Sequence, residues 1–250
     1  MTDDVLSLQA AFVCALPDDQ DLLRRAAAAT RIPVEVIDAN GLASTGRLPD
    51  TGVDIVFIDQ ALGGDAVVKV TSAARGAPKP PFTVLLVERA AEATFATDAL
   101  ANKPLGLEEA KQLVDRSVRV RTPSRVLIVD DSTTMRSIVR KILAATRFPL
   151  DISEVGRGSE ALEITRRIEF DLIFLDYNMP GFTGLETMGE IRRESPRTAF
   201  VLITSAQDDV VAKRARSLGA AFLKKPFYLA DIEAVLCGFY GLRALNPQRA

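Results

Sequence analysis

The 250-residue sequence contains no histidine and no tryptophan, and it has only two cysteines. The absence of histidine excludes serine–histidine and cysteine–histidine catalysis and a phosphohistidine carrier, and it removes the usual ligand of most zinc sites. Cys14 and Cys237 cannot make a disulfide framework, so we expect two small apolar side chains in a reducing cytoplasm. Any chemistry must therefore rest on carboxylates, hydroxyls, lysines and a metal ion.

An excess of positive charge is also lacking, because the formal net charge is −2 and no basic cluster occurs. A protein of this kind is a poor candidate for binding nucleic acid or an anionic membrane. The longest apolar runs have the length of a strand, and Asp3 and Asp4 stand where a signal peptide would need positive charge. We therefore expect a cytoplasmic protein that contacts neither nucleic acid nor membrane.

One short phrase occurs twice, as VDIVFIDQALGG at 53–64 and as FDLIFLDYNMPG at 170–181. From Arg125 onward, apolar strand-like runs alternate with helical spacing in five units, and the first half repeats this order more roughly. A second helix in the first half is doubtful, because glycine and proline interrupt GLASTGRLPDTG. Such alternation implies parallel sheets covered on both faces. We predict an α/β protein of two tandem, doubly wound, five-stranded parallel-sheet domains.

The hydrophobic fraction of 48% is ample for two cores, and the length suits two ordinary domains. The polar stretch around Pro123 breaks the pattern between the halves. We expect domains at residues 1–121 and 125–250, joined by a linker at 122–124.

Five polar residues of the second half follow the ends of successive predicted strands. These are Asp130, Asp131, Asp176, Thr204 and Lys225. Taken singly, each has an ordinary role, such as a helix cap, a turn residue or a residue of high β-propensity. Together they would bring three carboxylates to one sheet edge, where a hard cation such as Mg²⁺ relieves their repulsion. A hydroxyl and an ammonium beside the ion would make a pocket for a phosphoryl group.

The stretches VLIVDDSTTMRSIVRKIL, DLIFLDYNMPGFTGLE, VLITSA and AAFLKKPF resemble a receiver domain of a two-component response regulator, close to the stand-alone chemotaxis type. The resemblance covers about Arg125 to Gly241. It implies that Asp176 accepts a phosphoryl group from a sensor histidine kinase or a histidine phosphotransfer protein. It also implies that Asp131 and Asp176 ligate Mg²⁺ directly, Asp130 through water and Asn178 through its backbone carbonyl.

The same resemblance implies that Thr204 and Lys225 hold the phosphoryl oxygens, and that the Lys225–Pro226 peptide is cis. Phe222 takes the place of the switch aromatic, which is usually Tyr or Phe three residues before the lysine. Because Phe222 lacks a hydroxyl, a switch at this position would move a ring without gaining a phenol hydrogen bond.

The first half carries only part of this pattern. At a constant offset of 117, Asp59 falls on Asp176 and Val87 falls on Thr204, and Lys103 precedes a proline as Lys225 does. Lys103 follows Val87 by 16 residues, whereas Lys225 follows Thr204 by 21. This difference of five residues indicates that the fourth helix of the first half is shortened by more than a turn.

The acidic pair is replaced in this comparison by Leu16 and Pro17, and we expect Asp18 and Asp19 to cap the following helix. The alternative is that one of them turns into metal range. With few carboxylates left, we expect an ion pair between Asp59 and Lys103 and a degenerate receiver that does not share the chemistry of the second domain.

These features predict a response regulator in which a degenerate receiver precedes a working one, not an enzyme beyond slow Mg²⁺-dependent self-dephosphorylation. Because only ALNPQRA follows the last predicted helix, we expect no DNA-binding or enzymatic output, and signalling by protein contacts or by phosphoryl flow as an intermediate or sink. The alternatives are the regulatory portion of a larger output enzyme and a metal-dependent phosphatase or phosphotransferase.

Self-association through the fourth and fifth helices of the second domain is a further expectation, which rests on family analogy. The sequence hint is that Cys237 and Tyr240 fall partly off the apolar stripe of the last helix. Partial burial against the protein's own fourth helix is the alternative. The stripe consists of Leu229, Ile232, Leu236 and Phe239.

Overall fold

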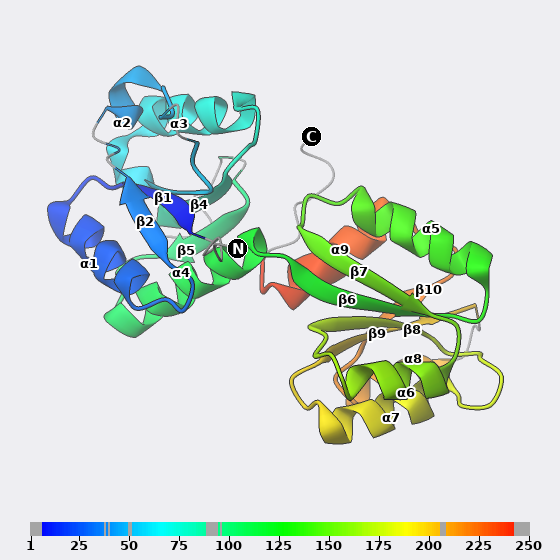
Figure 1. The fold of residues 1–250 in the computed structure, drawn as a ribbon. Coiled ribbons are helices and arrows are strands. Elements are labelled where there is room, and N and C mark those ends of the chain that lie inside the picture. Colours follow the sequence, from blue (N-terminus) through cyan, green and yellow to red (C-terminus); the bar gives the residue numbers. More distant parts are fainter. Residues whose placement is uncertain are drawn as a thin grey trace, which may run out of the picture. The chain divides into compact units, whose positions relative to one another are not determined.

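The structure is a computed structural model, and it describes residues 7–37, 39, 41–49, 52–88, 95, 97–205 and 209–242. The chain divides into two compact units: Met1–Thr122, to which Tyr240–Ala250 are assigned, and Pro123–Phe239. No helix in the described ranges is long and apolar enough to cross a membrane. Each unit is an open parallel sheet with helices on both faces (Figure 1).

The sheet of the first unit has the strand order β2-β1-β3-β4-β5, and every neighbouring pair is parallel. Helices α1 and α4 pack together on one face, and α2 and α3 pack together on the other (Figure 1). The elements are β1 (Leu8–Val13), α1 (Pro17–Ala28), β2 (Val34–Ile37), α2 (Leu42–Thr45), β3 (Ile55–Asp59), the 3₁₀ helix η1 (Gln60–Leu62), α3 (Gly64–Gly76), β4 (Phe82–Val87), β5 (Ala99–Asn102) and α4 (Leu107–Arg121).

The doubtful second helix exists, but it is a single turn. Helix α2 ends at Gly46, whose φ of +64° lies in the left-handed region that glycine adopts at little cost. The expected shortened fourth helix lies largely outside the described residues, since 89–94 and 96 are not among them.

The second unit repeats the same topology, with the strand order β10-β9-β8-β6-β7. Helices α5 and α9 lie on one face, and α6, α7 and α8 lie on the other (Figure 1). The elements are β6 (Ser124–Val129), α5 (Thr133–Ala144), β7 (Leu150–Val155), α6 (Gly158–Thr165), β8 (Leu172–Asp176), α7 (Gly184–Glu194), β9 (Ala199–Thr204), α8 (Asp209–Ser217), β10 (Ala221–Lys224) and α9 (Leu229–Phe239). The predicted fold class, two tandem doubly wound five-stranded sheets, is confirmed.

The central strands explain why the repeated phrase reads as an unbroken apolar run. All five residues of β3 and all five of β8 are buried, because helices cover both faces of a parallel sheet. Phe57 and Phe174 hold equivalent positions and are fully buried. Each such side chain contributes on the order of 1.5–3 kcal/mol by leaving water. The two aspartates that end these strands are therefore carried on the most rigid part of each unit.

Helix α7 begins directly against the end of β8. Gly184, its first residue, donates its N–H to the carbonyl of Tyr177 at 3.0 Å. A Cβ at Gly184 would lie 2.5 Å from the carbonyl oxygen of Asp176 and 3.0 Å from Leu202 Cδ1. Only glycine allows this approach, because a backbone oxygen cannot move aside as the tip of a flexible side chain can.

We expect Gly184→Ala to lower the free energy of unfolding by about 1–3 kcal/mol, since the added methyl must displace the end of β8. The matched control is Gly189→Ala in the same helix, where a Cβ would meet nothing within 4 Å. That change should be neutral or should stabilise by roughly 0.5–1 kcal/mol. Urea denaturation of the full chain measures both, and equal stability of the two variants would contradict the packing described.

Candidate functional site

The polar residues singled out in the second half meet at one edge of the second sheet. The central strands β6, β8 and β9 are neighbours, so their carboxyl ends lie side by side. Strand β10 then adds a lysine from the edge. The five residues are Asp130 and Asp131 after β6, Asp176 as the last residue of β8, Thr204 as the last of β9, and Lys225 after β10.

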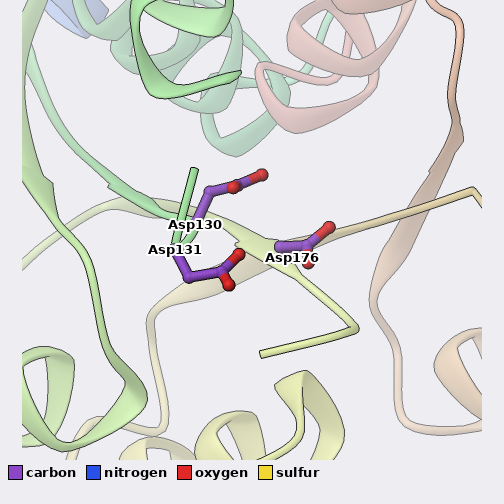
Figure 2. Close-up of side chains that lie close together, drawn as sticks. All are labelled: Asp130, Asp131 and Asp176. Carbon is purple, nitrogen blue, oxygen red and sulfur yellow. The ribbon is translucent and has the colours of Figure 1, made fainter. Parts of the chain in front are cut away.

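Three carboxylates converge here. One oxygen each from Asp130, Asp131 and Asp176 lies within 4.8 Å of the other two (Figure 2). Asp130 and Asp176 are buried, whereas Asp131 is exposed at the mouth of the site. Oxygen donors at this spacing suit a hard divalent cation such as Mg²⁺.

The ammonium of Lys225 lies between the two buried carboxylates. Its Nζ is 2.8 Å from Asp176 Oδ1 and 3.1 Å from Asp130 Oδ2. Burial alone would lower the pKa of Lys225, but the hydrogen bonds to Asp176 and Asp130 outweigh it and raise that pKa. Burial raises the pKa of Asp176 despite the nearby ammonium, and the charge of Asp130 adds to the increase. Asp176 thus still carries an electrostatic cost that a metal ion would relieve.

The remaining oxygens show which groups are open to a ligand. Asp130 Oδ1 accepts the N–H of Ser132 at 2.8 Å, and Asp176 Oδ2 accepts the N–H of Asn178 at 3.1 Å. The carboxylate of Asp131 has no hydrogen-bond or ion-pair partner within the described part of the chain. The donor set therefore fits Mg²⁺, with the exposed Asp131 as the group most open to it.

The other predicted residues also lie at this sheet edge. Thr204 is fully buried, and its carbonyl accepts the N–H of Lys225 at 2.8 Å. The Lys225–Pro226 peptide is cis. Phe222 packs against the core of the unit and lines a cavity of about 570 Å³ between the sheet and α9.

Sequence reasoning missed the contribution of Ser132. Its hydroxyl caps α5 by accepting the N–H of Met135 at 3.3 Å, while its own N–H binds Asp130. The signal was present, because serine directly before a helical pattern is a preferred N-cap.

The corresponding edge of the first unit differs from the sequence comparison. Val13 pairs with Ile58 in the first sheet as Val129 pairs with Leu175 in the second. The strand registers therefore place Cys14 and Ala15 at the positions of Asp130 and Asp131. The earlier assignment to Leu16 and Pro17 was wrong by two residues, because Pro17 already begins α1.

The expected ion pair between Asp59 and Lys103 is present, and the lysine also pairs with a second carboxylate. Lys103 Nζ lies 2.9 Å from Asp59 Oδ2 and 2.5 Å from Asp19 Oδ2. Asp18 and Asp19 do not cap α1, because they lie in its first turn and the N-cap is Leu16. Asp19 instead reaches back to the lysine. We call Asp19, Lys103 and Asp59 the first-unit clasp.

The clasp leaves Asp59 fully engaged. Its two oxygens accept N–H groups of Ala15 at 3.2 Å and of Ala61 at 3.0 Å, in addition to the lysine. The Lys103–Pro104 peptide is cis, and the N–H of Lys103 donates to the carbonyl of Val87 at 2.7 Å, as Lys225 does to Thr204. The backbone around the lysine is thus alike in both units, while the side chains that would hold a metal and a phosphoryl group are not.

Cys14 lies beside the clasp. Burial raises the pKa of its thiol to about 12, and the charges of Asp59 and Asp19 add to this effect. A neutral thiol therefore stands where the second unit has the carboxyl group of Asp130.

A known protein family matches part of the second unit. Residues 126–236 match the family model of the response regulator receiver domain. Over 129 residues the chain is 32% identical to the nitrate/nitrite response regulator protein NarP of Escherichia coli (strain K12), covering 51% of this chain and 60% of that protein. It is 33% identical over 133 residues to the transcriptional regulatory protein PdtaR of Mycobacterium tuberculosis (strain ATCC 25618 / H37Rv), covering 51% and 64%.

Among solved structures, the Vibrio cholerae chemotaxis protein CheY4 is 28% identical with a TM-score of 0.42, over 50% of this chain and 100% of that one. The chain covers less than two thirds of the length of the curated relatives. Residues 126–236 thus match a receiver domain of the response regulators.

We expect Lys103→Met to lower the free energy of unfolding by about 3 kcal/mol, because it leaves the buried carboxylate of Asp59 without its counter-charge. Burial alone would lower the pKa of Lys103, but hydrogen bonds to Asp19 and Asp59 raise it above 10.5. The stabilisation that Lys103 provides is therefore fully present at pH values below its unfolded pKa of 10.5, and it is lost as the pH rises through its pKa in the folded protein. Thermal unfolding should therefore separate wild type from the variant at about pH 8, and the difference should shrink as the pH rises through the folded pKa of Lys103, above 10.5.

The matched control is Lys79→Met. Lys79 also lies 2.9 Å from an aspartate, Asp54, but its side chain is 77% exposed. That pair should contribute less than about 1 kcal/mol. Equal losses from the two substitutions would mean that the clasp is no stronger than a surface ion pair.

Proposed function

We propose that this chain, whose residues 126–236 match a receiver domain, is a response regulator that accepts a phosphoryl group on Asp176. The observation that carries the proposal is the convergence of three carboxylates and Lys225 at one sheet edge. The partner is a sensor histidine kinase or a histidine phosphotransfer protein. The proposed domains are residues 1–121 and 125–250 with a linker at 122–124; α4 ends at Arg121, and β6 begins at Ser124, within that linker.

In the proposed step, a carboxylate oxygen of Asp176 attacks the phosphorus of a phosphohistidine. The new O–P bond forms as the N–P bond breaks, and the partner's imidazole leaves as the neutral base after taking up a proton. Lys225 and the hydroxyl of Thr204 hold the phosphoryl oxygens, where charge develops. Asp131 and Asp176 would hold Mg²⁺ directly, Asp130 through water and Asn178 through its carbonyl. When bound, the ion neutralises the phosphoryl oxygens and the carboxylates.

The first unit is proposed to be a degenerate receiver. Its acceptor-like Asp59 is satisfied by two N–H groups and by Lys103, and Ala15 and Val87 offer neither a metal ligand nor a hydroxyl. Both units pair a lysine with two carboxylates, but only the second adds a third, exposed carboxylate, Asp131. Phosphoryl transfer at this position is therefore not expected.

Rapid hydrolysis of the acyl phosphate is not expected from the second unit. An enzyme of that kind places an acid near the nucleophile to act on water or on the leaving group. The residue two positions after Asp176 is Asn178, a neutral amide. We propose self-dephosphorylation that is slow and depends on Mg²⁺, so that the protein serves as a binding switch or as a phosphoryl intermediate or sink.

We expect Asp176→Asn to abolish labelling by a small acyl-phosphate donor in the presence of Mg²⁺, and Asp59→Asn to leave it nearly unchanged. Only Asp176 has carboxylates, a hydroxyl and a lysine to stabilise the transfer. Asp131→Ala should reduce labelling by at least about tenfold, since the metal loses a direct ligand. Mass spectrometry of the 250-residue chain locates the phosphoryl group.

A phosphoryl group on Asp59, or label that survives in the Asp176→Asn variant, would contradict the proposal. The lifetime of the wild-type acyl phosphate then separates two outputs. Decay within seconds favours a phosphoryl sink, whereas decay over hours favours a switch that acts by protein contacts.

We also propose a homodimer through α8 and α9 of the second unit. The cavity lined by Phe222 opens beside α9. Tyr228, directly before α9, and Leu229, its first residue, are large hydrophobic side chains that are 69% and 40% exposed. Cys237 and Tyr240, which the sequence placed partly off the apolar stripe, are both buried within the chain itself and so do not support the contact. Light scattering should show a concentration-dependent dimer in the presence of an acyl-phosphate mimic, and a monomer at all concentrations would exclude it.

A further inference from the structure

Asp130 is held at every one of its polar atoms. Its carboxylate accepts Ser132 N–H and Lys225 Nζ, and its own N–H reaches the carbonyl of Val155 at 3.4 Å. Its backbone carbonyl accepts a hydrogen bond from Arg136 Nη1 at 2.7 Å. This last contact is short and charge-assisted, which makes it stronger than an ordinary hydrogen bond.

The carbonyl of Asp130 belongs to the same rigid plane as the N–H of Asp131. A rotation of this peptide would swing the Cα–Cβ bond of Asp131 and move its carboxylate away from Asp176. The carboxylate of Asp131 has no partner of its own in the described residues. Among the described residues, Arg136 is the side chain whose hydrogen bond to the carbonyl of this peptide is observed.

Arg136 is itself anchored from the neighbouring strand. Its Nε lies 3.4 Å from Glu154 Oε2, and its side chain is only 17% exposed. The other oxygen of Glu154 binds Nε of Arg140, whose Nη2 also donates to the carbonyl of Ile152 at 3.0 Å. Both arginines thus tie α5 to β7 through Glu154, but Arg136 alone of the two contacts Asp130.

We propose that Arg136 is a positioning residue that holds the 130–131 peptide so that Asp131 faces the metal site. The inference rests on the proposed function, because it assumes Mg²⁺ at this site. Charge and positioning predict opposite effects for removal of this arginine. Loss of a nearby positive charge would strengthen cation binding, whereas loss of the hydrogen bond would weaken it.

The test is calorimetric titration of the full-length protein with Mg²⁺ at fixed ionic strength. Arg136→Gln should weaken binding by about tenfold, as is typical when a group that orients a metal ligand is removed. The matched control Arg140→Gln removes the same charge from the same helix and the same Glu154, and it should stay within about twofold of wild type. Melting temperatures without Mg²⁺ report whether both variants are folded.

Binding by Arg136→Gln that is as tight as in Arg140→Gln, or tighter than in wild type, would overturn the proposal. If Arg136→Gln does not fold, Arg136→Lys decides, because it keeps the charge but loses the reach and planarity of the guanidinium. Weaker binding in that variant supports positioning, and unchanged binding refutes it. Absence of Mg²⁺ binding in wild type would overturn the proposed metal site itself, whereas binding in wild type with no change in Arg136→Gln would overturn only the role of Arg136.

Discussion

In both units a lysine ammonium lies between two carboxylates at the carboxyl edge of a parallel sheet. Buried carboxylates cannot share such a position without a counter-charge, because the cost of removing them from water is several kcal/mol per group. The lysine meets this requirement from the edge strand, and its backbone N–H is tied to the neighbouring strand in both units. The remaining features of each site are arranged around this pair of contacts.

The two units differ in where the second carboxylate originates. In the second unit it comes from the strand end, as Asp130, and the next residue adds a third carboxylate that faces solvent. In the first unit it comes from the first turn of α1, as Asp19, while the strand end carries a thiol and a methyl group. In this triad the lysine is paired with a carboxylate from the helix, and the strand end adds no carboxylate for a cation. The same topology thus supports an open acidic site in one unit and a closed ionic contact in the other.

Much of the fold and of the second site could be predicted from the sequence. Apolar strands that alternate with helices imply a parallel sheet, in which the carboxyl ends of all strands lie at one edge. The five polar residues of the second unit were found for that reason: strand ends in a parallel sheet must meet.

The local register of the first unit was not predicted correctly. Without a strand ladder, the shift that puts Cys14 rather than Leu16 opposite Asp130 cannot be seen, since neither residue carries the acidic signal. The role of Asp19 was also hidden, because an aspartate in a first helical turn usually needs no partner beyond the helix. Arg136 gave no signal either, since its contact is with a backbone carbonyl six residues away.

Cys14 has a consequence for the reactivity of the first unit towards electrophiles. Alkylating reagents and peroxides attack the thiolate, and a pKa of about 12 leaves roughly one thiol in 10⁵ ionised near neutral pH. Burial, with the charges of Asp59 and Asp19 in addition, therefore keeps this half-buried thiol protonated and unreactive. The only other cysteine, Cys237, is buried and accepts a hydrogen bond from Arg147. The surroundings of both thiols thus disfavour their oxidation and alkylation.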